Sequence, residues 1–289
     1  MKKRQTRVGK PMANVFRSYI LPPTYKDLPQ ITVLSTHRWP NFGDRLGFHL
    51  LSRLVPPQVP VVYASKPPRE LPPLPDRSRL LILYLGTSVF APILNQGLVS
   101  FAQSFQYSIG IFGTQYREQL RGSSDLFHRL LSGLTIWCAR YKEDLDLWGR
   151  PANGVHFGDW LVDMFPLTYP KVESSLNIPA SIRHTNVALD RTIQDVQRYA
   201  HVHSARLHPL LCALTSARSF SYEEQREYFG DGTSGKFRSL FLDVFNTDYL
   251  ENEAVSVDRQ AVIAYKIFVR KNIEQLASAI NVLFDGGSA

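Results

Sequence analysis

An uninterrupted apolar run, Leu80-Leu81-Ile82-Leu83-Tyr84-Leu85, constrains the fold of this chain more than any other segment. A run of this length is typical of a strand that is buried on both faces of a parallel sheet. Parallel strands need a crossover connection, usually a helix, between them. The chain is therefore expected to alternate strands and helices around this segment.

Strand and helix patterns do alternate between residues 31 and 159. Strands are predicted at 31–34, 61–63, 80–85, 107–113, 135–140 and 155–159. Helices are predicted at 46–54, 125–134 and 142–148. This alternation predicts an α/β domain with a doubly wound parallel sheet over residues 30–165.

A smaller α/β domain is expected over residues 166–289, and its first part, 166–178, has the prolines of an inter-domain linker. Its predicted strands lie at 201–206 and 219–222, and its predicted helices at 191–199, 207–214, 237–245 and 259–279. The last helices are expected to pack back across the first domain. Residues 1–29 are predicted to form a basic, irregular N-terminal arm.

The candidate site depends on the pattern of residues 201–213, where a strand period changes to a helix period. Arg206 and His208 lie at the change, with Pro209 in the first turn of the predicted helix. Open α/β sheets bind ligands at the carboxyl ends of strands, and helix N-termini favour anions. The alternative, a strand-to-helix corner with solvated polar residues, fits the pattern equally well.

The net charge of +8 over 289 residues calls for an anionic partner. The sequence has no zinc-finger spacing, RNP-like strand or basic helical block, so an anionic membrane surface or a phosphorylated ligand fits better than nucleic acid. Cys138 and Cys212 both lie in apolar stretches, as buried free thiols of a cytoplasmic protein do. No apolar run reaches the roughly 20 residues of a membrane span, and the basic N-terminus lacks the apolar core of a signal peptide.

Four segments, in order, resemble motifs of the polysaccharide pyruvyl transferase family. They are Asn41-Phe42-Gly43-Asp44, the strand Ile136-Trp137-Cys138-Ala139-Arg140, Gly158-Asp159 with Trp160 where proline is usual, and Ser204-Ala205-Arg206-Leu207-His208. The resemblance covers roughly residues 31–222. It implies two Rossmann-like domains that face each other across a cleft, as in GT-B glycosyltransferases. Residues 30–165 would then be the acceptor side and residues 166–289 the donor side.

The resemblance also implies a reaction and its partners. Such enzymes transfer the enolpyruvyl unit of phosphoenolpyruvate (PEP) onto two sugar hydroxyls as a ketal, and no metal or other cofactor is expected. The acceptor would be a lipid-linked saccharide, the precursor of a cell-surface polysaccharide, at the cytoplasmic face of the membrane. The basic N-terminal arm would then make a peripheral membrane contact.

The candidate residues suit this chemistry, because PEP carries a carboxylate and a phosphate that need cationic groups and helix N-terminal amides. Arg206 is expected to hold the donor and His208 to protonate its methylene carbon. Asp44 or Asp159 would take the hydroxyl proton, although a turn or helix-cap role is the alternative for both. The other donor-site candidates are Pro209, Arg140, Ser234, Gly235 and Lys236, and the acceptor-site candidates are Asn41, Arg45, Gln115 and Tyr116.

A glycine-rich loop, residues 230–236, precedes a predicted helix. Phe237 stands where a P-loop needs Ser or Thr to bind magnesium, which argues against an ATPase or kinase. The loop could still bind an anion through Ser234, Gly235 and Lys236, and a surface loop without a ligand is the alternative.

Other signals favour different functions. The Asp144-Leu145-Asp146 triplet matches the D-x-D of metal-dependent sugar transferases but lies in a predicted helix. His201 and His203 lack a third ligand nearby, so no metal site is predicted.

The His208-Pro209 pair resembles the nucleotide-binding motif of bacterial sialyltransferases and Kdo transferases, which implies a CMP-sugar donor as the second hypothesis. A third hypothesis is a non-catalytic polysaccharide-assembly protein with the same fold.

Overall fold

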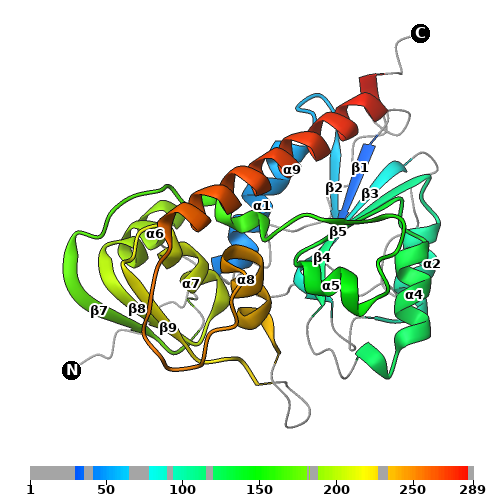
Figure 1. Cartoon of the computed structure of the whole chain (residues 1–289). Helices are drawn as coiled ribbons and strands as arrows, with labels where there is room; N and C mark the ends of the chain where they lie inside the picture. Colours follow the sequence, from blue (N-terminus) through cyan, green and yellow to red (C-terminus); the bar gives the residue numbers. More distant parts are fainter. Residues whose placement is uncertain are drawn as a thin grey trace, which may run out of the picture.

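The computed structural model describes residues 30–35, 42–64, 78–89, 94–114, 120–180, 182, 188–226 and 234–285. These residues form two α/β domains, each built on its own sheet (Figure 1). The predicted α/β fold with a smaller second domain is therefore confirmed.

The first sheet is all parallel, with six strands in the order β2-β1-β3-β4-β5-β6. The strands are β1 (Gln30–Leu34), β2 (Val61–Ala64), β3 (Ser78–Val89), β4 (Tyr107–Thr114), β5 (Ile136–Ala139) and β6 (Gly154–His156). Strand β1 lies between β2 and β3, with Val33 opposite Tyr63 on one side and Ile82 on the other. The chain adds β2 on one side of β1 and the later strands, from β3 on, on the other side. Open α/β sheets place their ligand crevices at such a switch point, which here lies between β1 and β3.

Strand β3 carries the apolar run because both of its faces are covered. Leu81 and Leu83 belong to the core that contains α2 (Gln96–Gln103) and α4 (Ser124–Ser132), whereas Ile82 and Tyr84 belong to the core on the opposite face, with α1 (Phe42–Leu54). All four side chains are fully buried. A short helix, α5 (Lys142–Leu147), and a 3₁₀ helix, η4 (Trp160–Met164), follow β5 and β6.

The second sheet has four strands in the order β10-β9-β8-β7. Strands β7 (Val172–Ile178), β8 (Tyr199–Ser204) and β9 (Ser219–Tyr222) are parallel, and β10 (Val255–Ser256) is antiparallel to β9. Its helices are α6 (Leu189–Gln197), α7 (Leu207–Leu214) and α8 (Lys236–Phe245).

The linker predicted at 166–178 is wrong over its second half, because Val172–Ile178 is strand β7. This strand lies at the sheet edge and most of its side chains are exposed, so Glu173, Ser174 and Ser175 replace the apolar alternation of an inner strand. Helix α2 and the two-residue strand β10 were also not predicted from the sequence.

The last helix, α9 (Arg259–Asp285), runs across both domains (Figure 1), as expected. Lys266 Nζ donates to the carbonyls of Val162 and Phe165 at 2.5 and 2.7 Å, and Asn272 Nδ2 donates to the carbonyls of His156 and Phe157. Helix α9 therefore fixes the segment that follows β6.

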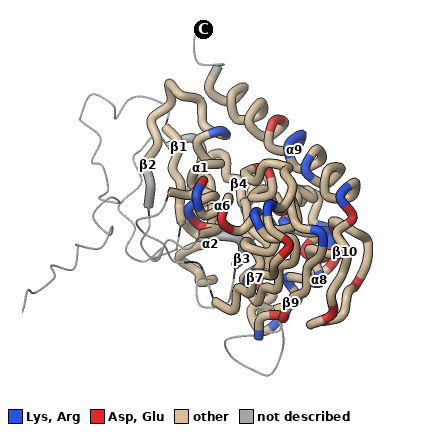
Figure 2. Tube along the Cα trace, turned by 90° about the vertical axis from the view of Figure 1, so that its left-hand side faces the viewer, with Lys and Arg blue, Asp and Glu red and all other residues tan. Residues whose placement is uncertain are grey.

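Basic residues outnumber acidic ones along α9 (Figure 2), which carries Arg259, Lys266, Arg270 and Lys271 against Glu274 and Asp285. Within the described ranges, no helix combines the length and hydrophobicity that crossing a membrane requires.

Candidate functional site

The candidate site lies where the carboxyl ends of the two sheets meet. Arg140 directly follows β5 and Asp159 follows β6, while Arg206 is the N-cap of α7, just after β8. Arg140 Nη2 lies 3.1 Å from His208 Nε2, in the first turn of α7, so the two carboxyl edges are in direct contact. The topology thus brings together residues that are far apart in the sequence.

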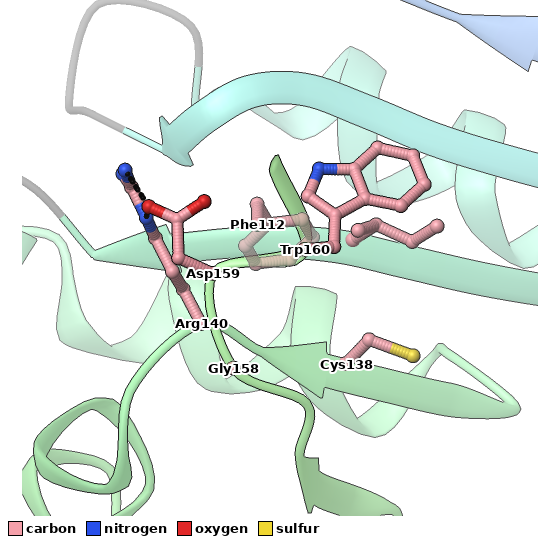
Figure 3. Close-up of a pocket in the computed structure, with 7 residues that line it drawn as sticks. Phe112, Cys138, Arg140, Gly158, Asp159 and Trp160 are labelled. Carbon is pink, nitrogen blue, oxygen red and sulfur yellow. Dashed lines mark hydrogen bonds and ion pairs between the residues drawn. The ribbon is translucent and has the colours of Figure 1, made fainter. Parts of the chain in front are cut away.

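Arg140 and Asp159 form a buried ion pair (Figure 3). Nη2 and Nε of Arg140 donate to Asp159 Oδ2 at 2.5 and 2.9 Å, and only 4% and 1% of the two side chains is exposed. Burial alone would lower the pKa of Arg140, but attraction and hydrogen bonding to Asp159 outweigh it and raise this pKa above its ordinary value. Asp159 is thereby engaged in holding Arg140, and it also caps η4 by accepting from Leu161 N.

The contact with Arg140 bears on how His208 could act. A guanidinium can only donate, so a hydrogen bond between the two uses His208 Nε2 as the acceptor. The sequence assigns His208 the role of general acid. That role stays a prediction.

Helix α1 lies against the other side of His208. A β-carbon on Gly43 would lie 2.0 Å from His208 Nδ1, so only glycine permits this approach. The next residue, Asp44, is buried in the first turn of α1. Burial, followed by the charge of Asp44, raises the pKa of the fully buried Tyr84, and Asp159 adds to the effect. The structure therefore brings Asp44, Asp159 and His208 into one cluster with Arg140.

Two further cations complete the site. The Arg206 guanidinium makes no hydrogen bond or ion pair with any other residue in the described part of the chain, and its Nε is buried. Lys236, at the start of α8, is 9% exposed. Burial, then repulsion by Arg140 and also by Arg206, lowers the pKa of Lys236 to about 7, and Glu224 offsets only part of this. Lys236 therefore interacts electrostatically with both arginines.

The start of α8 already has an anionic partner. Glu224 Oε2 accepts from Phe237 N at 2.9 Å and from Arg238 N at 3.4 Å, and Glu224 Oε1 accepts from Ser234 Oγ at 2.8 Å. Gly235 is the N-cap of α8 with a φ of 65°, which favours glycine. These contacts account for Ser234 and Gly235 without a ligand, and their donor-binding role stays a prediction.

Helix α7 begins differently from α8. Its N-cap, Arg206, provides no side-chain cap, because a guanidinium has no acceptor for the first N–H groups. Ser204 Oγ accepts from Arg206 N and donates to the carbonyl of the same residue. Pro209 is buried in the first turn. Among the described residues, a carboxylate accepts from the first N–H groups of α8, whereas the N-cap residue of α7 makes no side-chain cap.

A small cavity lies behind the ion pair (Figure 3). It is bounded by Ile111, Phe112, Cys138, Arg140, Gly158, Asp159 and Trp160. Its volume of ≈ 10 Å³ is room for about one water molecule and not for a sugar or PEP. This cavity is therefore not a donor-binding pocket.

The remaining candidates are divided between two groups. Asn41, Gln115, Tyr116 and loop residues 230–233 lie outside the described residues. Arg45 is half-buried in the first turn of α1, beside Asp44.

The metal-like patterns have structural roles. Asp144 caps α5 by accepting from Tyr141 N, and it also accepts from the amide and hydroxyl of Thr114. His201 and His203 lie against Ser219 and Ser221 on the neighbouring strand. Among the described residues, no group of three or more His, Cys, Asp and Glu side chains could hold a metal ion.

Besides Glu224, three residues of the site were not predicted from the sequence. Tyr84 was assigned to the apolar run, where its hydroxyl is the polar exception that could have identified it. Tyr265 of α9 accepts from Asp159 N at 2.7 Å, and Gln225 accepts from Lys236 Nζ. No local pattern identifies these two, because their contacts depend on how distant segments pack.

Comparison of the chain with models of known protein families and with curated protein sequences found no match.

Proposed function

We propose that this protein is a transferase that binds an anionic donor between the two sheets, and that the donor is phosphoenolpyruvate. The observation that carries the proposal is the convergence of Arg140, Arg206 and Lys236, which come from the ends of β5, β8 and the start of α8. Arg140 is balanced by Asp159, but Arg206 has no partner in the described part of the chain. A carboxylate and a phosphate on one small donor would match this excess of positive charge.

The acceptor in this proposal is a sugar of a cell-surface polysaccharide precursor, and the product is a pyruvate ketal. The first hydroxyl adds across the double bond of the donor, so that its oxygen bonds to the central carbon and its proton ends on the methylene carbon. The second hydroxyl then displaces phosphate, which leaves with the remaining proton. In this proposal Asp44 takes the first hydroxyl proton and His208 supplies the proton that the methylene carbon gains.

Calorimetric titration with PEP tests the proposal. Saturable binding that Arg206→Ala abolishes is the expected result, with Arg218→Ala as the matched control, because Arg218 is an exposed arginine paired with Glu173 at the far end of β9. His208→Ala is expected to bind PEP but to release phosphate at least about 10²-fold more slowly with acceptor present. Failure of the wild-type protein to bind PEP would refute the donor assignment.

A CMP-sugar donor is the second candidate. It is favoured by the start of α7, where the His208-Pro209 pair lies in the first turn and the N-cap residue, Arg206, is a cation that makes no side-chain cap and could receive a nucleotide phosphate. Titration with CMP separates the two candidates, since CMP binding without PEP binding would select the sugar transferase. Absence of binding by PEP, CMP and UDP would favour a non-catalytic polysaccharide-assembly protein.

A further inference from the structure

The side chain of Lys236 is buried without a charged hydrogen-bond partner in the described part of the chain. Its Nζ donates to the amide oxygen of Gln225. Gln225 is held in that orientation because its Nε2 donates to the carbonyl of Ala205 at 2.9 Å. An ammonium group has three donors, so a neutral amide oxygen is a poor match for a buried cation.

The charged groups around Lys236 do not supply the missing counter-charge. Arg140, from the end of β5, and Arg206, from the start of α7, both repel the ammonium. Glu224, from the segment after β9, attracts it, but this carboxylate accepts hydrogen bonds from the first turn of α8 and from Ser234.

The other elements packed against α8 use their charges elsewhere. On α5, Glu143 accepts from Arg238 and Ser239, and Lys142 N donates to Asp243. Asp243 also pairs with His156 of β6 at 2.6 Å. On α9, Tyr265 is in contact with the backbone of Asp159.

We propose that an anion binds at this site together with one proton, which Lys236 takes up as the anion arrives. The inference rests on the proposed function only in naming PEP as the natural anion. Without ligand, burial and then the charges of two guanidinium groups disfavour the ammonium form. A bound phosphate or carboxylate reverses that balance, because an opposite charge within a few ångströms stabilises the cation. The free site is then close to half-protonated near neutral pH, since the pKa of Lys236 is about 7.

Proton uptake predicts that the affinity for the anion decreases as the pH rises. Above about pH 7 the free site must first gain a proton, so the affinity falls by up to tenfold for each pH unit until the ordinary lysine range is approached. A site made of arginines alone would keep its affinity over the same range.

Calorimetry in buffers of different ionisation enthalpy, such as Tris and Hepes, measures the uptake. The probes are PEP and inorganic sulfate at about pH 8, where both are fully ionised and any proton taken up belongs to the protein. Wild type should take up close to one proton per anion. Lys236→Arg should bind without uptake, and Lys236→Met should bind more weakly, also without uptake.

Lys266→Met is the matched control, because Lys266 is the second buried lysine with a lowered pKa but lies at η4, away from the cation cluster. It should retain the uptake. Binding without uptake in wild type, or uptake that persists in both Lys236 variants, would overturn the inference and leave the proposed function intact. Uptake with sulfate but no binding of PEP would support the inference and refute the proposed donor. If neither anion binds, both are refuted.

Discussion

Gly43 and His208 are in such close contact that a β-carbon on residue 43 would lie 2.0 Å from Nδ1 of the imidazole. Gly43→Ala should therefore destabilise the protein by about 1–3 kcal/mol, because the ring must move away from Arg140. In a His208→Ala background the same substitution should cost almost nothing, since the ring is gone. Urea unfolding of the two single variants and the double variant measures this coupling. Additive effects would show that the helix–ring contact does not exist in solution.

The buried pair of Arg140 and Asp159 predicts a large effect of removing one charge. Asp159→Asn leaves the Arg140 guanidinium buried without its counter-charge, so the free energy of unfolding should fall by about 3–5 kcal/mol. The matched control is Asp146→Asn, which breaks the exposed pair with Arg150 and should cost less than about 1 kcal/mol. Equal losses in the two variants would contradict the importance of burial at the site.

Lys266 predicts a pH dependence of stability. Burial is the main reason that its pKa is lowered to about 8 from the ordinary 10.5, although Asp163 partly offsets the effect. Between these two values the unfolded chain binds more protons than the folded protein, so the contribution of Lys266 to stability increases as the pH rises. The difference in unfolding free energy between wild type and Lys266→Met should thus increase from about pH 8 to 10. A constant difference would show that Lys266 titrates normally in the folded protein.

The sequence predicted an element well where a strand is buried on both faces, or where a change of period is visible within a few residues. The run Leu80–Leu85 predicted β3 because both faces of that strand are covered, and the Arg206–His208 turn was placed correctly because a strand period and a helix period meet there. Strand β7 was missed because most of its side chains are exposed to solvent, so that the apolar alternation is absent.

The composition of the site was predictable only in part. Residues at the ends of strands, such as Arg140 and Asp159, could be identified because parallel strands share a carboxyl edge. Their pairing with each other could not be predicted from the sequence. This ion pair occupies the carboxylate of Asp159, which the sequence had offered as a possible base. Tyr265 reaches the site from α9, more than 100 residues along the chain from Asp159, and only the packing of that helix places it there.

The position of Glu224 at the start of α8 predicts that an added anion can take the place of its carboxylate. Glu224→Ala leaves the first-turn N–H groups of Phe237 and Arg238 without their carboxylate, which should lower the free energy of unfolding by about 1–2 kcal/mol. Sulfate should stabilise this variant more than wild type, because it can occupy the vacated helix N-terminus in addition to any site that both proteins share. Thermal unfolding with and without sulfate measures the difference, and Glu173→Ala, which removes an exposed carboxylate, should respond to sulfate as wild type does. An identical sulfate response in Glu224→Ala and wild type would mean that Glu224 does not act as the internal anion of α8.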